Sequence, residues 1–297
     1  MGTMVTFPRE KHASGKQMRF TDMKEEQDRE ILARILLENV ANWVADRDRD
    51  VIVGMDMGGG GATRPALTDE ECAELAKAGA GSYGHCTIIE PVDLDLYESY
   101  MYAPLKMPEK PEIMLSYWDM NRGVAPFMEG RVMVKALCPD GIESWLVISV
   151  PVPNFYTCLE GNCWGWPKYV CDEMTVEKDR SEVIYEGKVR LSMDFSPGGL
   201  DDATVAKLKA QGTEGGNTIS FAIDGGTGCL MRQGRGPADT DPNRNYFVEW
   251  EAGMITTYMR PEDKFSRMLP DPCVTPGFWQ WSIGRGGGPA GGMFKVT

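Results

Sequence analysis

Apolar residues recur at helical spacing near the start of the chain. Between residues 22 and 46 they stand three or four positions apart, which indicates one buried helix face. These apolar residues are Ile31, Leu32, Ile35, Leu36, Val40, Trp43 and Val44. Asp22, with Glu25 three residues later, forms a helix-start pattern. We therefore predict an amphipathic helix over residues 22–46, preceded by a polar, disordered start of about 20 residues.

A second, shorter helix is predicted after a glycine-rich connector. Residues 58–61 are four consecutive glycines. They lack the Gly-Lys-Ser/Thr ending of a phosphate-binding loop, so we interpret them as a flexible connector. Thr68 and Glu71 then have the spacing of a capping box, in which each side chain binds the other residue's backbone N–H. This pattern predicts a helix over residues 69–78.

Beyond about residue 85 the apolar residues form short runs, which are typical of β-strands. In residues 183–195, Val189, Leu191 and Met193 alternate with polar neighbours, as in a half-buried antiparallel strand. One helix is expected among the strands, at residues 200–211. The predicted strands are 113–118, 132–137, 145–150, 183–195, 218–223, 246–259 and 293–296.

Together these elements predict an α+β fold that is mostly antiparallel β. We expect a closed β-barrel or sandwich with few helices and an added N-terminal helical segment. Residues 1–80 would form the extension and residues 81–297 the main domain. A chain of 297 residues is long enough for that domain to bury a substantial core.

The charge balance excludes some classes of partner. The chain has 31 Lys and Arg against 44 Asp and Glu, a formal net charge of −13. Such a surface repels nucleic acid and anionic lipid, so neither is an expected partner. There is no apolar run of about 18 residues and no signal-like start, which favours a cytoplasmic protein without a membrane span.

The cysteines and histidines narrow the possible chemistry further. The eight cysteines are dispersed, and Cys158, Cys163 and Cys171 lack zinc spacing, so we expect free thiols and no metal. The two histidines are His12, in the polar start, and His85, before an apolar run. A structural role is the simpler interpretation of His85, and a pocket role is the alternative. The chemistry must therefore rest mainly on Lys, carboxylates, Tyr or Cys.

The most unusual segment of the sequence places one lysine among large apolar residues. Lys168 follows Trp164, Trp166 and Pro167 and precedes Tyr169. Full burial of a lysine lowers its pKa and leaves a neutral amine, which attacks carbonyl carbon. The alternative is a lysine whose stem lies on the tryptophans while its ammonium stays in water.

Two motifs resemble those of the acetoacetate decarboxylase superfamily. Gly165-Trp166-Pro167-Lys168 is similar to the family's Gly-aromatic-Pro-Lys motif, whose lysine forms a Schiff base with the substrate carbonyl. The segment 123–130 resembles a second family motif, whose glutamate faces that lysine; here it is Glu129, 39 residues before Lys168. The likeness covers roughly residues 85–297, which would then be the catalytic domain.

The resemblance implies a site and a reaction class. Lys168 would be the Schiff-base lysine and Glu129 its partner, without a cofactor. The family's second lysine is here Tyr169, and its upstream arginine and second acid are replaced by His85 and by Met114 or Ser116. This altered lining favours a substrate larger than acetoacetate. The residues expected to contact the substrate are Tyr169, Trp166, Trp164, Phe127, Trp118 and His85.

Three functions remain open from the sequence. The first is a lyase that condenses an oxo acid or related carbonyl compound by aldol-type chemistry, followed by dehydration. The second is a β-oxo acid decarboxylase, and the third is a non-catalytic member that binds a carbonyl ligand. The family also implies a homo-oligomer.

Glu129 and Tyr169 each have competing interpretations. Glu129 would shuttle protons if an apolar site raised its pKa. It could instead be an exposed residue at a strand start, or pair with Arg122 or Arg131. Tyr169 would donate a hydrogen bond to the reacting oxygen or simply pack as a strand aromatic.

Overall fold

The computed structural model describes the strands and the helices that surround the predicted lysine segment. The described residues are 51–53, 67–121, 127–155, 157–158, 161, 165–210, 218–224, 227–234, 245–284 and 292–295. The predicted helix 22–46, the start of the chain, the glycine connector 58–61, Arg122 and Trp164 lie outside these residues. The division at residue 80 stays a prediction.

Fourteen strands and a few short helices make up the described part of the chain. The helices are α2 (Asp69–Lys77), α3 (Leu94–Glu98), α5 (Asp202–Ala210) and the 3-10 helix η5 (Lys264–Met268). The strands are β1 (Val51–Val53), β2 (Gly81–Ile89), β3 (Ile113–Asn121), β4 (Phe127–Leu137), β5 (Glu143–Val152), β6 (Lys168–Val170), β7 (Glu173–Val176), β8 (Arg180–Tyr185), β9 (Lys188–Pro197), β10 (Thr218–Asp224), β11 (Thr227–Gly234), β12 (Asn245–Met259), β13 (Cys273–Gly284) and β14 (Gly292–Lys295).

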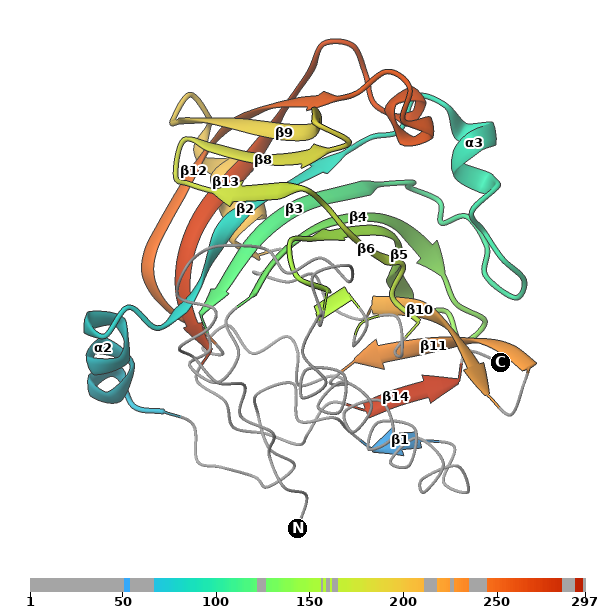
Figure 1. Ribbon diagram of the computed structural model, residues 1–297, viewed down its shortest axis with the longest axis horizontal. Coiled ribbons are helices and arrows are strands. Elements are labelled where there is room, and N and C mark those ends of the chain that lie inside the picture. Colours follow the sequence, from blue (N-terminus) through green and yellow to red (C-terminus); the bar gives the residue numbers. More distant parts are fainter. Residues whose placement is uncertain are drawn as a thin grey trace.

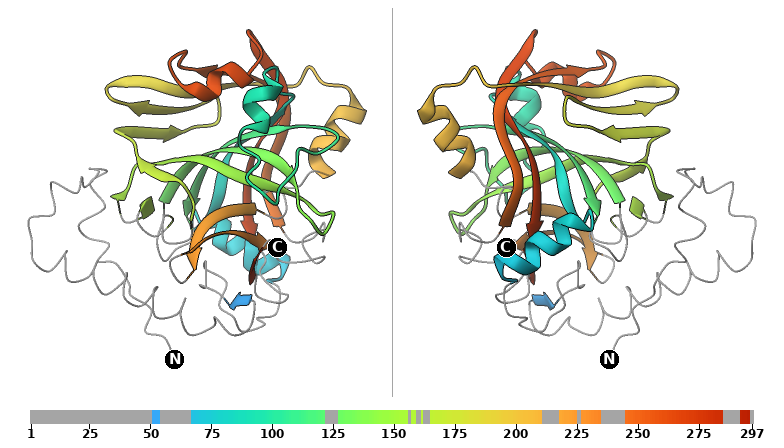
Figure 2. Two further views of the ribbon diagram at one scale, coloured as in Figure 1. Left: turned by 90° about the vertical axis from the view of Figure 1, so that its right-hand side faces the viewer. Right: turned by 90° about the vertical axis from the view of Figure 1, so that its left-hand side faces the viewer.

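The strands form one strongly curved sheet. Its order is β1-β14-β11-β10-β5-β4-β3-β2-β13-β12-β9-β8-β7, with β6 beside β5. In Figure 1 the strands from β12 to β5 form an arch, and Figure 2 shows the β8–β9 layer projecting from one end. All the pairings are antiparallel except those of β5 with β10 and with β6.

The predicted mostly antiparallel β architecture with few helices is therefore confirmed. The described strands follow an open path with two ends, so the closed barrel is not confirmed. Nor is the N-terminal helical segment. The short helix α2 does form, and its Thr68–Glu71 capping box is present, with hydrogen bonds of 2.8 and 3.2 Å.

One predicted strand is two strands. The alternation in residues 183–195 predicts a single strand, but β8 and β9 form a hairpin there. Glu186 and Gly187 make the turn, with φ of 55° and 68°. Two left-handed residues are the turn geometry that matches the twist of a hairpin. Gly187, at the second position, is typical of such a turn. Glu186, at the first position, is not, because glutamate rarely adopts a left-handed conformation.

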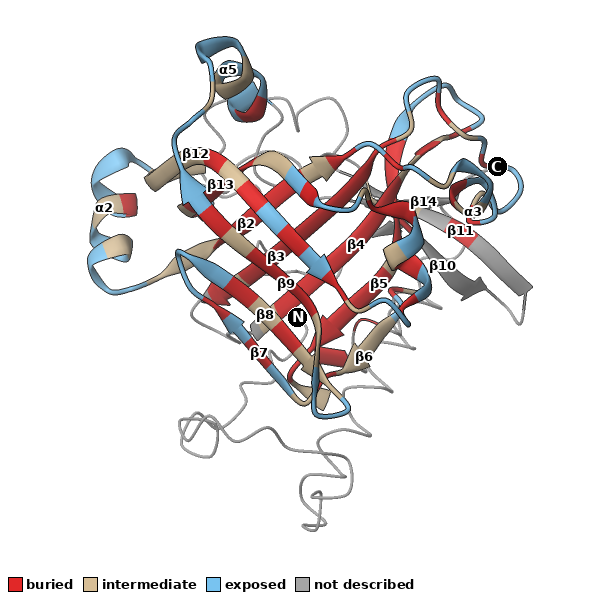
Figure 3. Ribbon diagram, turned by 90° about the horizontal axis from the view of Figure 1, so that it is seen from above, coloured by how far each residue is buried: buried red, intermediate tan, exposed pale blue. Residues whose placement is uncertain are grey.

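Side chains alternate between two faces of the sheet, and each face has its own core. One core contains Leu115, Tyr117 and Val132, and β7, β8 and β9 contribute to it. The other core contains Trp118, Met133, Val150 and Trp166. We call the second face the tryptophan face. Figure 3 shows that the central strands β2, β3 and β4 are mostly buried, as this two-sided packing requires.

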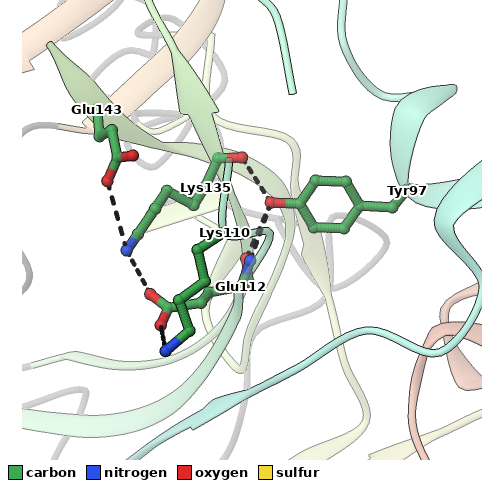
Figure 4. Close-up of polar contacts among 5 residues, drawn as sticks. All are labelled: Tyr97, Lys110, Glu112, Lys135 and Glu143. Atoms are coloured by element: carbon green, nitrogen blue, oxygen red, sulfur yellow. Dashed lines mark hydrogen bonds and ion pairs between the residues drawn. The ribbon is translucent and has the colours of Figure 1, made fainter. Parts of the chain in front are cut away.

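The buried Tyr97 links α3 to the sheet by hydrogen bonds. The hydroxyl of Tyr97 donates to the carbonyl of Lys135 at 2.5 Å and accepts from the N–H of Glu112 at 3.3 Å. Lys135 forms ion pairs with Glu112 and, at 3.6 Å, with Glu143 (Figure 4). The network satisfies Glu112, which is otherwise a buried carboxylate, and it contributes no residue to the site below.

Candidate active site

Three strands bring Lys168 and Glu129 together. Glu129 lies on β4, and β4 pairs with β5, beside which β6 starts at Lys168. The Lys168 Nζ atom donates to Glu129 Oε2 at 2.8 Å across the 39 residues between them. Both side chains are buried, with 7% and 3% of their surface exposed. The interpretation of Glu129 as an exposed strand-start residue is therefore wrong.

The turn before β6 positions Lys168 at the start of that strand. Gly165 has φ of 74°, a conformation that other residues adopt only with strain. The N–H of Trp166 donates to the Gly161 carbonyl at 3.0 Å, and the Lys168 N–H donates to the Trp166 carbonyl at 2.7 Å. Pro167 has no N–H, and its carbonyl accepts from Val150 at 3.2 Å. The motif residues thus build a tight turn that leads into the strand.

Gly161 makes room for the lysine stem, which sequence reasoning missed. A Cβ atom at Gly161 would lie 2.2 Å from Cδ and 2.4 Å from Cε of Lys168. Any other residue at this position would push the lysine side chain aside. The signal was present in the sequence, since Gly161 opens the segment that contains Lys168, but its contact with Lys168 arises only from the fold.

Arg131 is the third charged residue of the site. Its Nε donates to Glu129 Oε1 at 2.7 Å, and its terminal nitrogen pairs with the same oxygen. The guanidinium carbon of Arg131 and the Nζ of Lys168 each lie 5.6 Å from the centre of the Trp166 ring. Both distances suit cation–π attraction. The predicted pair of Glu129 with Arg131 is thus confirmed, and Trp166 contacts both cations.

The two cations reverse the effect of burial on the glutamate. Burial favours a protonated carboxyl, but Arg131 and Lys168 outweigh it and lower the pKa of Glu129 to about 2. The condition on which Glu129 would shuttle protons, a raised pKa, is therefore not met. With Lys168 protonated, the three buried side chains comprise two positive charges and one negative charge.

Two predicted contact residues lie near this cluster. Trp166 stacks on it, and Trp118 is the register partner of Glu129 on the neighbouring strand, almost fully buried. Phe127 is the first residue of β4, two positions before Glu129.

The structure does not bring His85 and Tyr169 to the Lys168 side chain. Tyr169 follows Lys168 on β6 and packs on the opposite core, edge-on to Tyr185 at 5.3 Å between ring centres. Burial raises its pKa, so it stays a neutral phenol.

His85 also belongs to the core opposite the tryptophan face. Its ring lies 4.8 Å from that of Trp279, a residue of that core. Its two nitrogens bond Ser181 Oγ and the Lys178 carbonyl, each at 2.8 Å. Burial lowers its pKa to about 4. These contacts describe a neutral histidine packed in the core.

The fold resembles solved structures of one enzyme family. Comparison of the sequence with protein-family models and with curated proteins finds no match. An acetoacetate decarboxylase from Legionella pneumophila aligns with a TM-score of 0.51 at 14% identity, over 71% of this chain and 84% of that one. A second acetoacetate decarboxylase structure aligns with a TM-score of 0.53 at 11% identity, over 73% and 88% of the two chains. The chain therefore shares its fold with acetoacetate decarboxylases, and this is the fold that the resemblance of its two motifs led us to expect.

Proposed function

We propose that the chain is a Schiff-base-forming lyase that acts on an oxo acid, or a related carbonyl compound, through Lys168. The observation that carries the proposal is the buried Lys168, held 2.8 Å from Glu129 in an acetoacetate decarboxylase-like fold. A buried lysine amine beside a fixed carboxylate is a rare arrangement, because both charges lose their hydration. Such sites are commonly functional.

The chemistry starts at the lysine nitrogen. The ammonium of Lys168 first gives up a proton, and the neutral amine forms a C–N bond with the ketone carbon. Return of that proton, with loss of water, gives an iminium ion. The iminium carries the same single positive charge as the ammonium that it replaces, so Glu129 stabilises both states. It draws electrons from the adjacent carbon, which then loses either a proton or carbon dioxide and becomes an enamine.

The position of Glu129, rather than its basicity, favours the proton route. An enamine formed by proton loss needs a nearby acceptor, and the Glu129 carboxylate, a weak base because its pKa is lowered, lies within reach of the reacting nitrogen. Decarboxylation needs no such acceptor. We therefore prefer aldol-type condensation of the enamine with an aldehyde, followed by dehydration, and keep decarboxylation of a β-oxo acid as the second candidate.

Reductive trapping tests the proposal. The protein is incubated with pyruvate, treated with borohydride, digested and analysed by peptide mass spectrometry. We expect a carbonyl-dependent adduct on the peptide that contains Lys168, absent from Lys168→Met. Lys135 is the internal control, because it is also largely buried and paired with a glutamate. Adducts confined to exposed lysines, or no adduct at all, would contradict the Schiff base and favour a non-catalytic binder.

A second assay separates the two reactions. An oxo acid is supplied with and without an aldehyde, and both carbon dioxide release and enone formation are followed by NMR. Aldehyde-dependent enone formation supports condensation and dehydration. Carbon dioxide release without aldehyde supports the decarboxylase.

A further inference from the structure

Ser116 carries a buried hydroxyl on the tryptophan face with no hydrogen-bond partner among the described residues. Only 1% of the residue is exposed. It lies on β3, two positions before Trp118, so both side chains are on the same face of the strand. A buried hydroxyl without a partner has lost its hydrogen bonds to water and has no protein hydrogen bond to replace them, which costs free energy. A ligand that binds at this face would supply the missing hydrogen bond.

The neighbours of Ser116 show what kind of ligand would fit. Its register partner on β4 is Arg131, which places their Cβ atoms about 5 Å apart. Its other register partner, Cys86 on β2, is apolar in character. Arg131 belongs to the cluster with Glu129 and Lys168, which has one net positive charge whenever the Lys168 nitrogen is an ammonium or an iminium. A hydroxyl donor beside surplus positive charge suits an anion.

We propose that Ser116 is a substrate-contacting residue that donates its hydrogen bond to the carboxylate of the oxo acid, beside Arg131. The carboxylate would neutralise the surplus charge of the cluster, while the substrate carbonyl meets Lys168. The inference rests on the proposed function for the identity of the ligand. It adds a position that determines specificity, one that prefers ketones with a carboxylate to ketones without one.

Gln280 has the other unpartnered buried oxygen on this face in the part of the chain described. The strand register runs from Gln280 through Gly84 and Trp118 to Glu129, three strand spacings away. That separation is about 14 Å along the sheet. One carboxylate cannot span it, so Gln280 is not part of the proposed subsite.

The test compares two ketones that differ in the carboxylate. Borohydride trapping is measured against concentration for pyruvate and for acetone, with the wild type, Ser116→Ala and Tyr100→Phe. Tyr100→Phe is the matched control, because it also removes a buried hydroxyl without a partner, from the opposite core. We expect Ser116→Ala to raise the half-saturating pyruvate concentration about tenfold and to leave acetone unchanged. Tyr100→Phe should change neither ketone.

An equal shift for both ketones, or no shift, would overturn the assignment of Ser116. Lactate binding, followed by calorimetry, gives a reading that does not require an imine. If neither ketone is trapped, the Schiff-base proposal fails, and lactate still decides the subsite. Binding about tenfold weaker in Ser116→Ala supports it, whereas equal binding or none refutes it. Ser116→Ala should not lower the melting temperature, because the hydroxyl has no hydrogen bond to lose among the described residues.

Discussion

Arg131 sets the charge state of the site at the scale of single residues. Glu129 has two cationic neighbours, and their attraction exceeds the cost of burying its charge. A buried ion pair loses much of its value when one partner is removed, because the remaining charge is left uncompensated. The arginine is therefore as important to the local structure as the lysine that would carry the chemistry.

Replacing Arg131 with methionine leaves Glu129 paired with Lys168 alone. The loss of hydrogen bonds to the buried carboxylate should destabilise the protein by about 2 kcal/mol, measured by urea unfolding at pH 7. The matched control is Arg180→Met, which removes an arginine paired with Glu182 and Asp194 whose side chain is 45% exposed. Its effect should stay below about 1 kcal/mol, since exposed pairs contribute little. Similar losses in the two variants would contradict the compensated charge of Glu129.

A methyl group at Gly161 should disable the lysine without unfolding the protein. The new Cβ would occupy the space of the Lys168 stem and displace its amine from Glu129. We expect Gly161→Ala to lower the rate of reductive trapping by at least about tenfold, as misplacement of a reacting group does. Gly284→Ala is the control, because the nearest atom to its added Cβ, Asn245 Oδ1, lies 4.0 Å away and its backbone is not left-handed. Trapping at the wild-type rate in Gly161→Ala would show that the lysine does not need this space.

At the scale of elements, short strands and tight turns carry the site residues. β6 has three residues and holds its place by parallel pairing with β5. Because side chains alternate along a strand, Lys168 and Tyr169 must face opposite ways. This alternation alone argued against placing Tyr169 in the same pocket as the lysine, although the family motif has a functional residue at that position.

The β8–β9 turn is strained at Glu186, so a glycine there should stabilise the hairpin. The left-handed φ of 55° costs a glutamate about 1 kcal/mol that glycine avoids. We expect Glu186→Gly to raise the free energy of unfolding by several tenths to about 1 kcal/mol, measured by urea titration. Glu186→Ala keeps a Cβ and should bring no gain. A gain in both variants would point to the lost carboxylate instead.

At the scale of the whole molecule, the curved sheet separates two environments. One face holds the charged cluster among tryptophans, and the other holds neutral His85 under β8 and β9. The described helices include none that is both long and apolar enough to cross a membrane. The two faces respond to acid in different pH ranges, because they bury different titratable groups.

Stability should fall in two steps as the pH is lowered. His85 has a folded pKa of about 4 against 6.5 when unfolded, so the unfolded chain binds more protons between these values. Stability is therefore full above pH 6.5 and declines toward pH 4, by up to about 3 kcal/mol. Glu129, with a folded pKa of about 2 against 4.5, adds a second loss below pH 4.5.

Urea unfolding from pH 8 to pH 4 measures the first step. His85→Gln should flatten the decline between pH 6.5 and pH 4, because glutamine does not titrate. His12 is the only other histidine in the sequence. An unchanged slope in His85→Gln would mean that another group controls acid stability.

The sequence by itself determined the local features of this protein. The capping box at Thr68 depends on neighbouring residues. The strands predicted at 113–118 and 145–150 depend on periodicity, and they are observed with longer bounds at 113–121 and 143–152. The motif with Gly165, Pro167 and Lys168 likewise encodes its own turn. Motif resemblance also paired Lys168 with Glu129, because the spacing of two family motifs records a contact that local physics does not reveal.

The tertiary structure alone decided the features that depend on distant contacts. The hairpin turn at Glu186 is held against its own conformational preference by the pairing of β8 with β9. The face on which His85 lies, and the space that Gly161 leaves for Lys168, follow from the packing of separate strands. The pKa of Glu129 is lowered rather than raised because the fold brings the charges of Arg131 and Lys168 next to its carboxylate. Electrostatics and packing act through space, whereas a sequence pattern reports only neighbours along the chain.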